Sequence, residues 1–140
     1  YIAMLGGEFI VHGAQQKASL TVADPHWPGL PASGNSDIME EWYALKNFAP
    51  DLHVILVMNT EGMKGDMYQR PPYPETWARK HHKGRVFFTS LGHREDVWQS
   101  DFMQGLLLSA LAWTLGNVEA DVTPNIDKVT LQANDLPGKK

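Results

Sequence analysis

Residues 83–93 have the sequence Lys-Gly-Arg-Val-Phe-Phe-Thr-Ser-Leu-Gly-His. The apolar run at 86–89 predicts a short strand that is buried on both faces. Gly92 gives the backbone freedom that a tight turn needs directly after this strand. In an open α/β sheet, ligands bind at the carboxyl ends of strands, where His93 can donate, accept, titrate or bind metal. On spacing alone, a turn histidine that only hydrogen-bonds the backbone is the alternative.

Two further strands and a helix accompany this segment. Residues 52–59 are apolar nearly throughout, which predicts a strand covered on both faces. Residues 17–23 alternate apolar and polar side chains, as in a half-exposed strand. Residues 100–115 predict a largely buried helix that Ser100 caps. A doubly wound α/β sheet has about five strands, so we expect only its C-terminal part, with the missing strands outside this chain or supplied by another chain.

Less regular segments separate these elements. Residues 24–35 and 62–74 are rich in proline and glycine, and a polar loop as long as the second is unusual unless it is functional or flexible. Residues 76–80 predict a helical turn. Residues 118–140 are polar and aperiodic, which predicts a tail or linker that is strand-like at 128–131.

The bulk composition excludes several classes of protein. The 140 residues, 43% hydrophobic and 20% charged, fit one globular domain. The net charge of −4 argues against a nucleic-acid-binding protein, and we interpret the basic cluster at 79–85 as a solvated loop. The absence of cysteine excludes disulfides, thiolate metal sites and a cysteine nucleophile within this chain. No apolar run reaches the roughly 18 residues of a membrane span.

A set of short motifs occurs in a fixed order along the chain. They are Gly6-Gly7-Glu8-Phe9-x-x-His12, His26-x-Pro28-Gly29-Leu30-Pro31, Glu41-Trp42-Tyr43, Trp77, the segment from Gly84 to His93, Trp98 and Trp113-x-x-Gly116. In this order they resemble the ThuA-like (trehalose-utilisation) domain over about residues 1–117. The resemblance implies a class I glutamine-amidotransferase-like, flavodoxin-like fold, with residues 118–140 as tail or linker. It also implies the subgroup found in large secreted or periplasmic proteins, hence a periplasmic or secreted location.

The chain departs from the family pattern in two ways. The N-terminal half of the domain is missing, and Glu40-Glu41 stands where the family usually has Asp-Glu. The family resemblance also implies that the glutaminase triad is not retained, and a glutaminase needs a thiolate that this chain lacks. We therefore reject ammonia transfer.

The remaining polar candidates suit a site built from histidine and carboxylate side chains. They are His12, His26, Glu40, Glu41 and His93. Imidazole and carboxylate groups are suitable ligands for a divalent metal such as zinc, with His12, His26 and His93 as ligands. No diagnostic spacing such as HExxH supports the metal, so each histidine could instead be an ordinary turn or loop residue. Glu40 and Glu41 are adjacent and cannot both point the same way on a regular element, and Glu41 aligns with the family carboxylate.

Two functions remain open on the sequence. The resemblance implies an enzyme of carbohydrate metabolism that acts on trehalose-like or keto-disaccharides, with His93 and Glu41 catalytic. The substrate would then contact His12, His26, Tyr43 and Trp98, although aromatic residues such as Trp98 are more often core or lid residues. The alternative is a non-catalytic sugar-binding or scaffolding domain that keeps the fold without its nucleophile. Open strand edges would also favour association with the missing half or a homo-oligomer.

Overall fold

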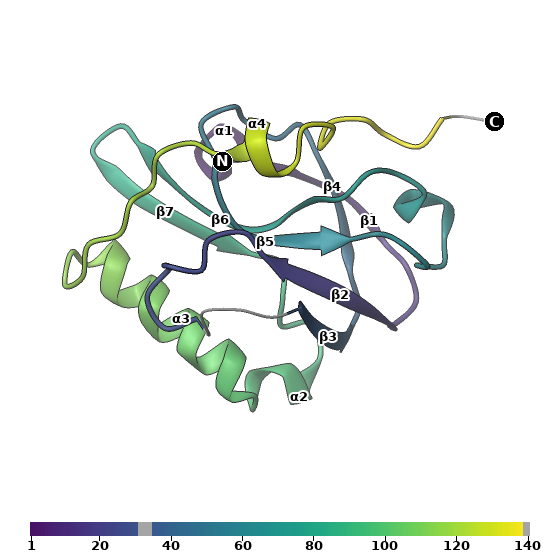
Figure 1. The fold of residues 1–140 in the computed structure, drawn as a ribbon, viewed down its shortest axis with the longest axis horizontal. Helices are drawn as coiled ribbons and strands as arrows, with labels where there is room; N and C mark the ends of the chain where they lie inside the picture. Colours follow the sequence, from purple (N-terminus) through teal and green to yellow (C-terminus); the bar gives the residue numbers. More distant parts are fainter. Residues whose placement is uncertain (31–34, 139–140) are drawn as a thin grey trace.

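The computed structural model describes residues 1–30 and 35–138 and has a mixed α/β architecture (Figure 1). The elements in chain order are α1 (Ile2–Leu5), β1 (Glu8–His12), β2 (Gln16–Val22), β3 (Asn35–Glu40), β4 (Tyr43–Lys46), β5 (His53–Asn59), η1 (Asp66–Tyr68), β6 (Tyr73–His81), β7 (Gly84–Thr89), α2 (Glu95–Trp98), α3 (Asp101–Thr114) and α4 (Ile126–Val129). Residues 31–34 of the predicted loop, including Pro31 of the family motif, lie outside the described residues. No helix in the described ranges is long and apolar enough to cross a bilayer.

The strands form two antiparallel sheets. Five strands follow the order β3-β2-β5-β6-β7 in a curled sheet, and β1 pairs with β4 in a separate ribbon. Every pairing in both sheets is antiparallel. The connection between β6 and β7 is too short for parallel strands, which need a crossover of a dozen or more residues. The described strands therefore do not have the parallel order that we expected, and the doubly wound, flavodoxin-like arrangement is not confirmed.

The three predicted strands are present, and their places in the sheet explain their burial. β5 is central and buried along nearly its whole length, and β2 alternates between buried and more exposed positions, as predicted. β7 is an edge strand, so its residues are only half-buried rather than covered on both faces. The strand nevertheless ends at Thr89, directly before the predicted turn.

Two local predictions are wrong. Residues 76–80 belong to strand β6 rather than to a helical turn, because β6 pairs with β5 on one side and β7 on the other. Strand partners on both sides override weak local preference. Residues 128–131 are not strand-like, since helix α4 runs through Val129. The predicted 62–74 loop contains the short η1 helix and already includes the start of β6.

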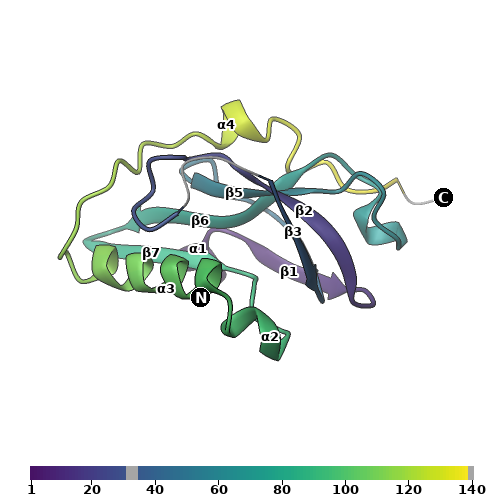
Figure 2. The same ribbon diagram turned by 60° about the horizontal axis from the view of Figure 1, so that its bottom comes forward.

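Helix α3 forms as predicted and covers one face of the sheet. The Ser100 hydroxyl accepts the Met103 N–H at its N-terminus. Both views place α3 along β7 and α4 on the opposite side of the sheet (Figure 2). The prediction of a largely buried helix is wrong for one stripe, because Leu108, Leu111 and Leu115 are exposed.

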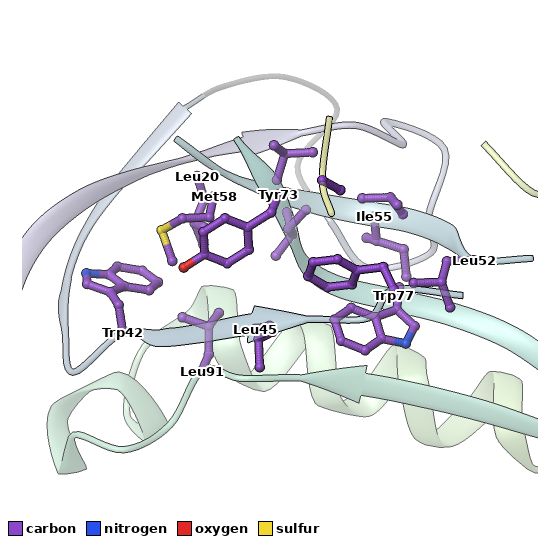
Figure 3. Packing of buried hydrophobic residues seen from close by; sticks show 14 of the residues in the cluster. Leu20, Trp42, Leu45, Leu52, Ile55, Met58, Tyr73, Trp77 and Leu91 are labelled. Atoms are coloured by element: carbon purple, nitrogen blue, oxygen red, sulfur yellow. The ribbon is translucent and has the colours of Figure 1, made fainter. Parts of the chain in front are cut away.

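The core lies between β6, β5 and the ribbon strand β4 (Figure 3). Leu45 of β4 meets Tyr73 and Trp77 of β6 within one cluster of fully buried side chains. The Trp77 ring stacks on Phe88 with 4.2 Å between ring centroids. This packing fixes β4, and with it the residues just before β4, against the main sheet.

Part of the segment after Val118, up to Asn134, is tied to the rest of the fold, although the sequence predicts a tail or linker. The Asn125 side chain accepts the Val54 N–H at 2.6 Å and donates to the Val54 carbonyl at 3.1 Å. Asn134 makes the same pair of bonds with the backbone of Phe48. Ile126 and Ala133 are buried.

Candidate functional site

The predicted turn after β7 places His93 at the surface. Gly92 has φ 104°, a conformation that glycine adopts far more readily than other residues. A Cβ atom at Gly92 would also lie 3.0 Å from the Trp98 ring, whose Nε1–H donates to the Gly92 carbonyl at 2.7 Å. Gly92 therefore has the backbone conformation that the predicted turn requires, and the Trp98 ring packs on this turn.

The Glu41 carboxylate joins two histidines from distant parts of the chain. Its Oε1 lies 2.8 Å from His12 Nδ1, and its Oε2 lies 2.5 Å from His93 Nδ1. His12 ends β1, Glu41 follows β3, and His93 follows β7. These are ion-pair contacts, and the hydrogen bond of His12 runs elsewhere: the Gly13 carbonyl only accepts, so His12 Nδ1 donates to it at 3.2 Å. Both Nδ1 atoms face oxygens of the protein, and both imidazole side chains are about two-fifths exposed (42% and 41%).

Aromatic rings surround the two imidazoles. The Tyr43 ring lies 5.7 Å from the His93 ring and 6.2 Å from the His12 ring, measured between centroids. Phe9 contacts Tyr43 edge-to-face at 4.8 Å and is half exposed. The structure thus brings the predicted residues His12, Glu41, Tyr43 and His93 into one cluster.

His26 does not join this cluster among the described contacts. Its backbone N–H donates to Asp24, and its side chain is exposed. The neighbouring Trp27 donates to Ser109 of α3 at 3.1 Å, which anchors the loop on that helix. The sequence could not separate His26 from the other histidines, because its loop position follows from this tertiary contact.

The two adjacent glutamates both reach the turn after β7 but in different surroundings. Glu41 faces the imidazoles and is partly exposed, whereas the Glu40 side chain is completely buried. The Glu40 carboxylate meets the backbone of this turn, and the Glu41 carboxylate meets the His93 side chain.

A polar cleft of about 480 Å³ opens beside His93. It is lined by Gln15, His93, Arg94, Glu95, Asp96 and Gln99. The Arg94 guanidinium binds both carboxylate oxygens of Asp96, each at 2.9 Å, and also donates to Gln15. These hydrogen bonds lower the pKa of Asp96. The sequence prediction included His93 and missed the other lining residues, because polar side chains in a turn carry no distinctive spacing.

Tyr68 supports the site from the long 62–74 loop. Its hydroxyl accepts the Gly13 N–H at 2.9 Å and donates to the Trp42 carbonyl at 2.5 Å. Burial raises the pKa of Tyr68, so the hydroxyl stays protonated and can donate. The Tyr68 hydroxyl thereby holds together the residues that follow His12 and Glu41. In the sequence, the unusual length of the 62–74 loop indicated that the loop could have such a role.

A second buried glutamate anchors the start of the His93 turn. Glu75 of β6 is fully buried and accepts the Ser90 N–H at 3.0 Å and the Ser90 hydroxyl at 2.7 Å. Thr76 and Thr89 complete this network. Burial raises the pKa of Glu75 above its usual value of 4.5, despite these hydrogen bonds.

The raised pKa of Glu75 predicts a pH-dependent loss of stability. The unfolded chain releases the Glu75 proton above about pH 4.5, whereas the folded chain retains it to higher pH. The contribution of Glu75 to the free energy of unfolding is therefore fully present below pH 4.5 and declines as pH rises towards the folded pKa. Urea unfolding of wild type and Glu75→Gln between pH 4 and 8 isolates this contribution, since every other group is shared. We expect wild type to lose stability relative to Glu75→Gln as pH rises; parallel curves would contradict the raised pKa.

The residues present form only part of a metal site. The Nδ1 atoms of His12 and His93 both lie against the Glu41 carboxylate, which leaves Nε2 as the atom that could bind a metal. A catalytic zinc usually has three protein ligands, and His26 does not supply the third. Within residues 1–30 and 35–138, no group of three or more His, Asp or Glu side chains is arranged to hold a metal ion.

Comparison with known proteins adds a family to this geometry. Searches of the curated proteins and of the solved structures give no significant match. The family model described as ThuA, trehalose utilisation, matches residues 1–114, which include His12, Glu41, Tyr43 and His93. The match confirms the resemblance and supports a role related to carbohydrate metabolism. The chain therefore belongs to the ThuA, or trehalose-utilisation, family.

Proposed function

We propose that this chain binds a sugar at the cleft beside His93 and transfers protons to and from it through His93 and His12. The observation that carries the proposal is the single carboxylate, Glu41, whose two oxygens lie 2.8 Å from His12 Nδ1 and 2.5 Å from His93 Nδ1. A carboxylate that holds Nδ1–H fixes the tautomer and the orientation of an imidazole and stabilises its protonated form.

The two imidazoles can serve as the base and the acid of one reaction, since histidine is suited to proton transfer in either direction near neutral pH. The neutral imidazole can take a proton from a sugar hydroxyl, or from a carbon next to a keto group, at its Nε2. The protonated imidazole can give a proton to an oxygen on the same sugar. The ring centroids of His12 and His93 are 5.6 Å apart, so one small substrate can reach both.

The surroundings suit a sugar in size and chemistry. The cleft of about 480 Å³ falls within the usual range for small-molecule sites. Its amide, guanidinium and carboxylate groups can bind hydroxyl groups, and the half-exposed Phe9 ring, with the partly buried Tyr43 ring beside it, can cover the apolar face of a pyranose. Disaccharides of the trehalose type and their keto derivatives are the substrates that we propose to test first.

A zinc-dependent form of the proposal uses the same Nε2 atoms. It would need a third ligand beyond His12 and His93. Acid–base chemistry needs no further group, and we take it as the first form to test.

Glu41→Gln is the variant that tests the proposal, with His26→Ala as its control. Glutamine keeps the size but presents an N–H group to one of the two imidazoles. The assay measures the products of disaccharide turnover by chromatography. We expect wild type and His26→Ala to turn the sugar over at the same rate. In Glu41→Gln the rate should fall roughly 10–100-fold, the size usual for a group that orients an imidazole. His26→Ala should match wild type because it lies outside the cluster.

Binding measurements separate the second candidate function. Saturable binding of a disaccharide without turnover, weakened in Glu41→Gln, would favour a non-catalytic sugar-binding domain; the exposed aromatic rings are the observation that supports this candidate. Neither binding nor turnover with any sugar would reject both functions.

A further inference from the structure

Glu40 is a completely buried carboxylate that accepts four backbone N–H groups. Its Oε1 accepts from Glu41 at 2.7 Å and from Arg94 at 3.0 Å. Its Oε2 accepts from Gly92 at 2.9 Å and from His93 at 3.1 Å. The side chain has no exposed surface. All the donors are peptide groups, and three of them are consecutive residues of the His93 turn.

These hydrogen bonds are what makes the buried charge tolerable. No ion pair to Glu40 is found in the described part of the chain, and the Arg94 guanidinium is directed to Asp96 instead. Every N–H points at an oxygen, so the group is an acceptor only, as an ionised carboxylate is. Charge-assisted hydrogen bonds of this kind are stronger than those between neutral groups.

Two of the four donors belong to the residues whose side chains meet in the site. The backbone N–H of Glu41 and the backbone N–H of His93 bind the same carboxylate, while their side chains pair with each other at 2.5 Å. A closed ring of contacts thus joins the end of β3 to the turn after β7. Without Glu40, only the side-chain contact between His93 and Glu41 would remain of these contacts, and the two backbones would no longer be held to a common carboxylate.

We infer that Glu40 is a positioning residue that sets the geometry of the His93–Glu41 pair. It does not reach the cleft and does not contact a substrate. Its part in turnover rests on the proposed function, but its effect on His93 can be measured on the protein alone.

The test compares Glu40→Gln with Glu75→Gln. Both remove a buried carboxylate next to the turn, but the turn contacts of Glu75 are with Thr89 and Ser90. The glutamine at position 40 keeps one oxygen and turns an NH₂ group towards two N–H donors, so two of the four hydrogen bonds are lost. The control, Glu75→Gln, keeps the hydrogen bonds from the backbone of residues 92–94 to Glu40.

The readout is the imidazole ¹⁵N and ¹H spectrum of His93 in the whole 140-residue chain, assigned with His93→Gln. We expect the strongly hydrogen-bonded Nδ1–H signal of His93 in wild type and Glu75→Gln, and its loss or a large shift in Glu40→Gln. A thermal melt shows that each variant is folded. If the sugar assay gives turnover, kcat of Glu40→Gln should fall roughly 10–100-fold with KM little changed.

Unchanged His93 signals in Glu40→Gln, or the same change in Glu75→Gln, would overturn the inference. A failure of the proposed function looks different, because turnover is then absent in every variant while the His93 signals still differ. Should Glu40→Gln not fold, Glu40→Ala refolded with formate replaces it. Formate can take the place of the carboxylate between the N–H groups, so it should restore the His93 signals; no effect of formate on them would equally overturn the inference.

Discussion

Replacement of Trp77 with alanine is expected to lower the free energy of unfolding by about 3–5 kcal/mol, the usual cost of emptying a large aromatic site. Trp77 has no exposed surface, and its ring stacks on Phe88 and meets Phe48 edge-on at 5.8 Å. Its Nε1–H also donates to the Leu5 carbonyl at 2.8 Å. The substitution therefore removes packing on both sides of the ring and leaves a buried carbonyl without its donor.

Urea unfolding followed by circular dichroism measures this loss, with Trp98→Ala as the matched control. The Trp98 side chain is about half exposed and makes one hydrogen bond, to Gly92, so its removal should cost only about 0.5–1.5 kcal/mol. Equal losses in the two variants would show that Trp77 is not at the centre of the core.

Replacement of His93 with glutamine is expected to lower the rate of sugar turnover by roughly 10²–10⁴-fold, the range that a positioned acid or base contributes. The glutamine amide can still donate to Glu41, so the variant removes proton transfer at Nε2 and little else. The turnover rate of the disaccharide is compared in wild type, His93→Gln and His82→Gln. His82 lies exposed in the β6–β7 hairpin and serves as the control that should keep the wild-type rate.

The same variants decide between the two forms of the site. Plasma mass spectrometry of the dialysed proteins measures bound metal. One equivalent of metal in wild type and none in His93→Gln would make His93 a ligand. Equal metal content combined with the lost rate would favour acid–base chemistry. A His93→Gln rate equal to that of wild type would rule out a catalytic role for His93.

Local pattern was sufficient where the structure depends on neighbours in sequence. The apolar run of β5, the Ser100 cap of α3 and the Gly92 turn after β7 are all set within a few residues, and all were predicted. β6 was missed because its strand conformation depends on β5 and β7, which pair with it from either side. The antiparallel order was missed for the same reason, since pairing direction is a property of the whole sheet.

The sequence predicted the kinds of side chain in the site, but not which of the candidate residues come together. His12, Glu41 and His93 were identified as candidate site residues from the ordered motifs, but nothing in the sequence shows that Glu41 binds both imidazoles. His26 has the same chemistry and sits in a motif as distinct as theirs, and only its anchorage on α3 separates it from the site. Alternation along a strand led us to expect Glu40 and Glu41 on different sides, yet both carboxylates reach the His93 turn. The four peptide groups that bind Glu40 come from two places far apart in the chain, which local pattern does not reveal.

The paired hydrogen bonds of Asn125 and Asn134 bear on where this domain can be cut. The family match stops at residue 114, yet Asn125 completes the backbone hydrogen bonding of Val54 in the central strand, and Asn134 does so for Phe48. A chain shortened to the matched residues would leave these peptide groups exposed to water or to another strand. The family match therefore ends twenty residues before Asn134, a residue whose side chain still completes backbone hydrogen bonds of the fold.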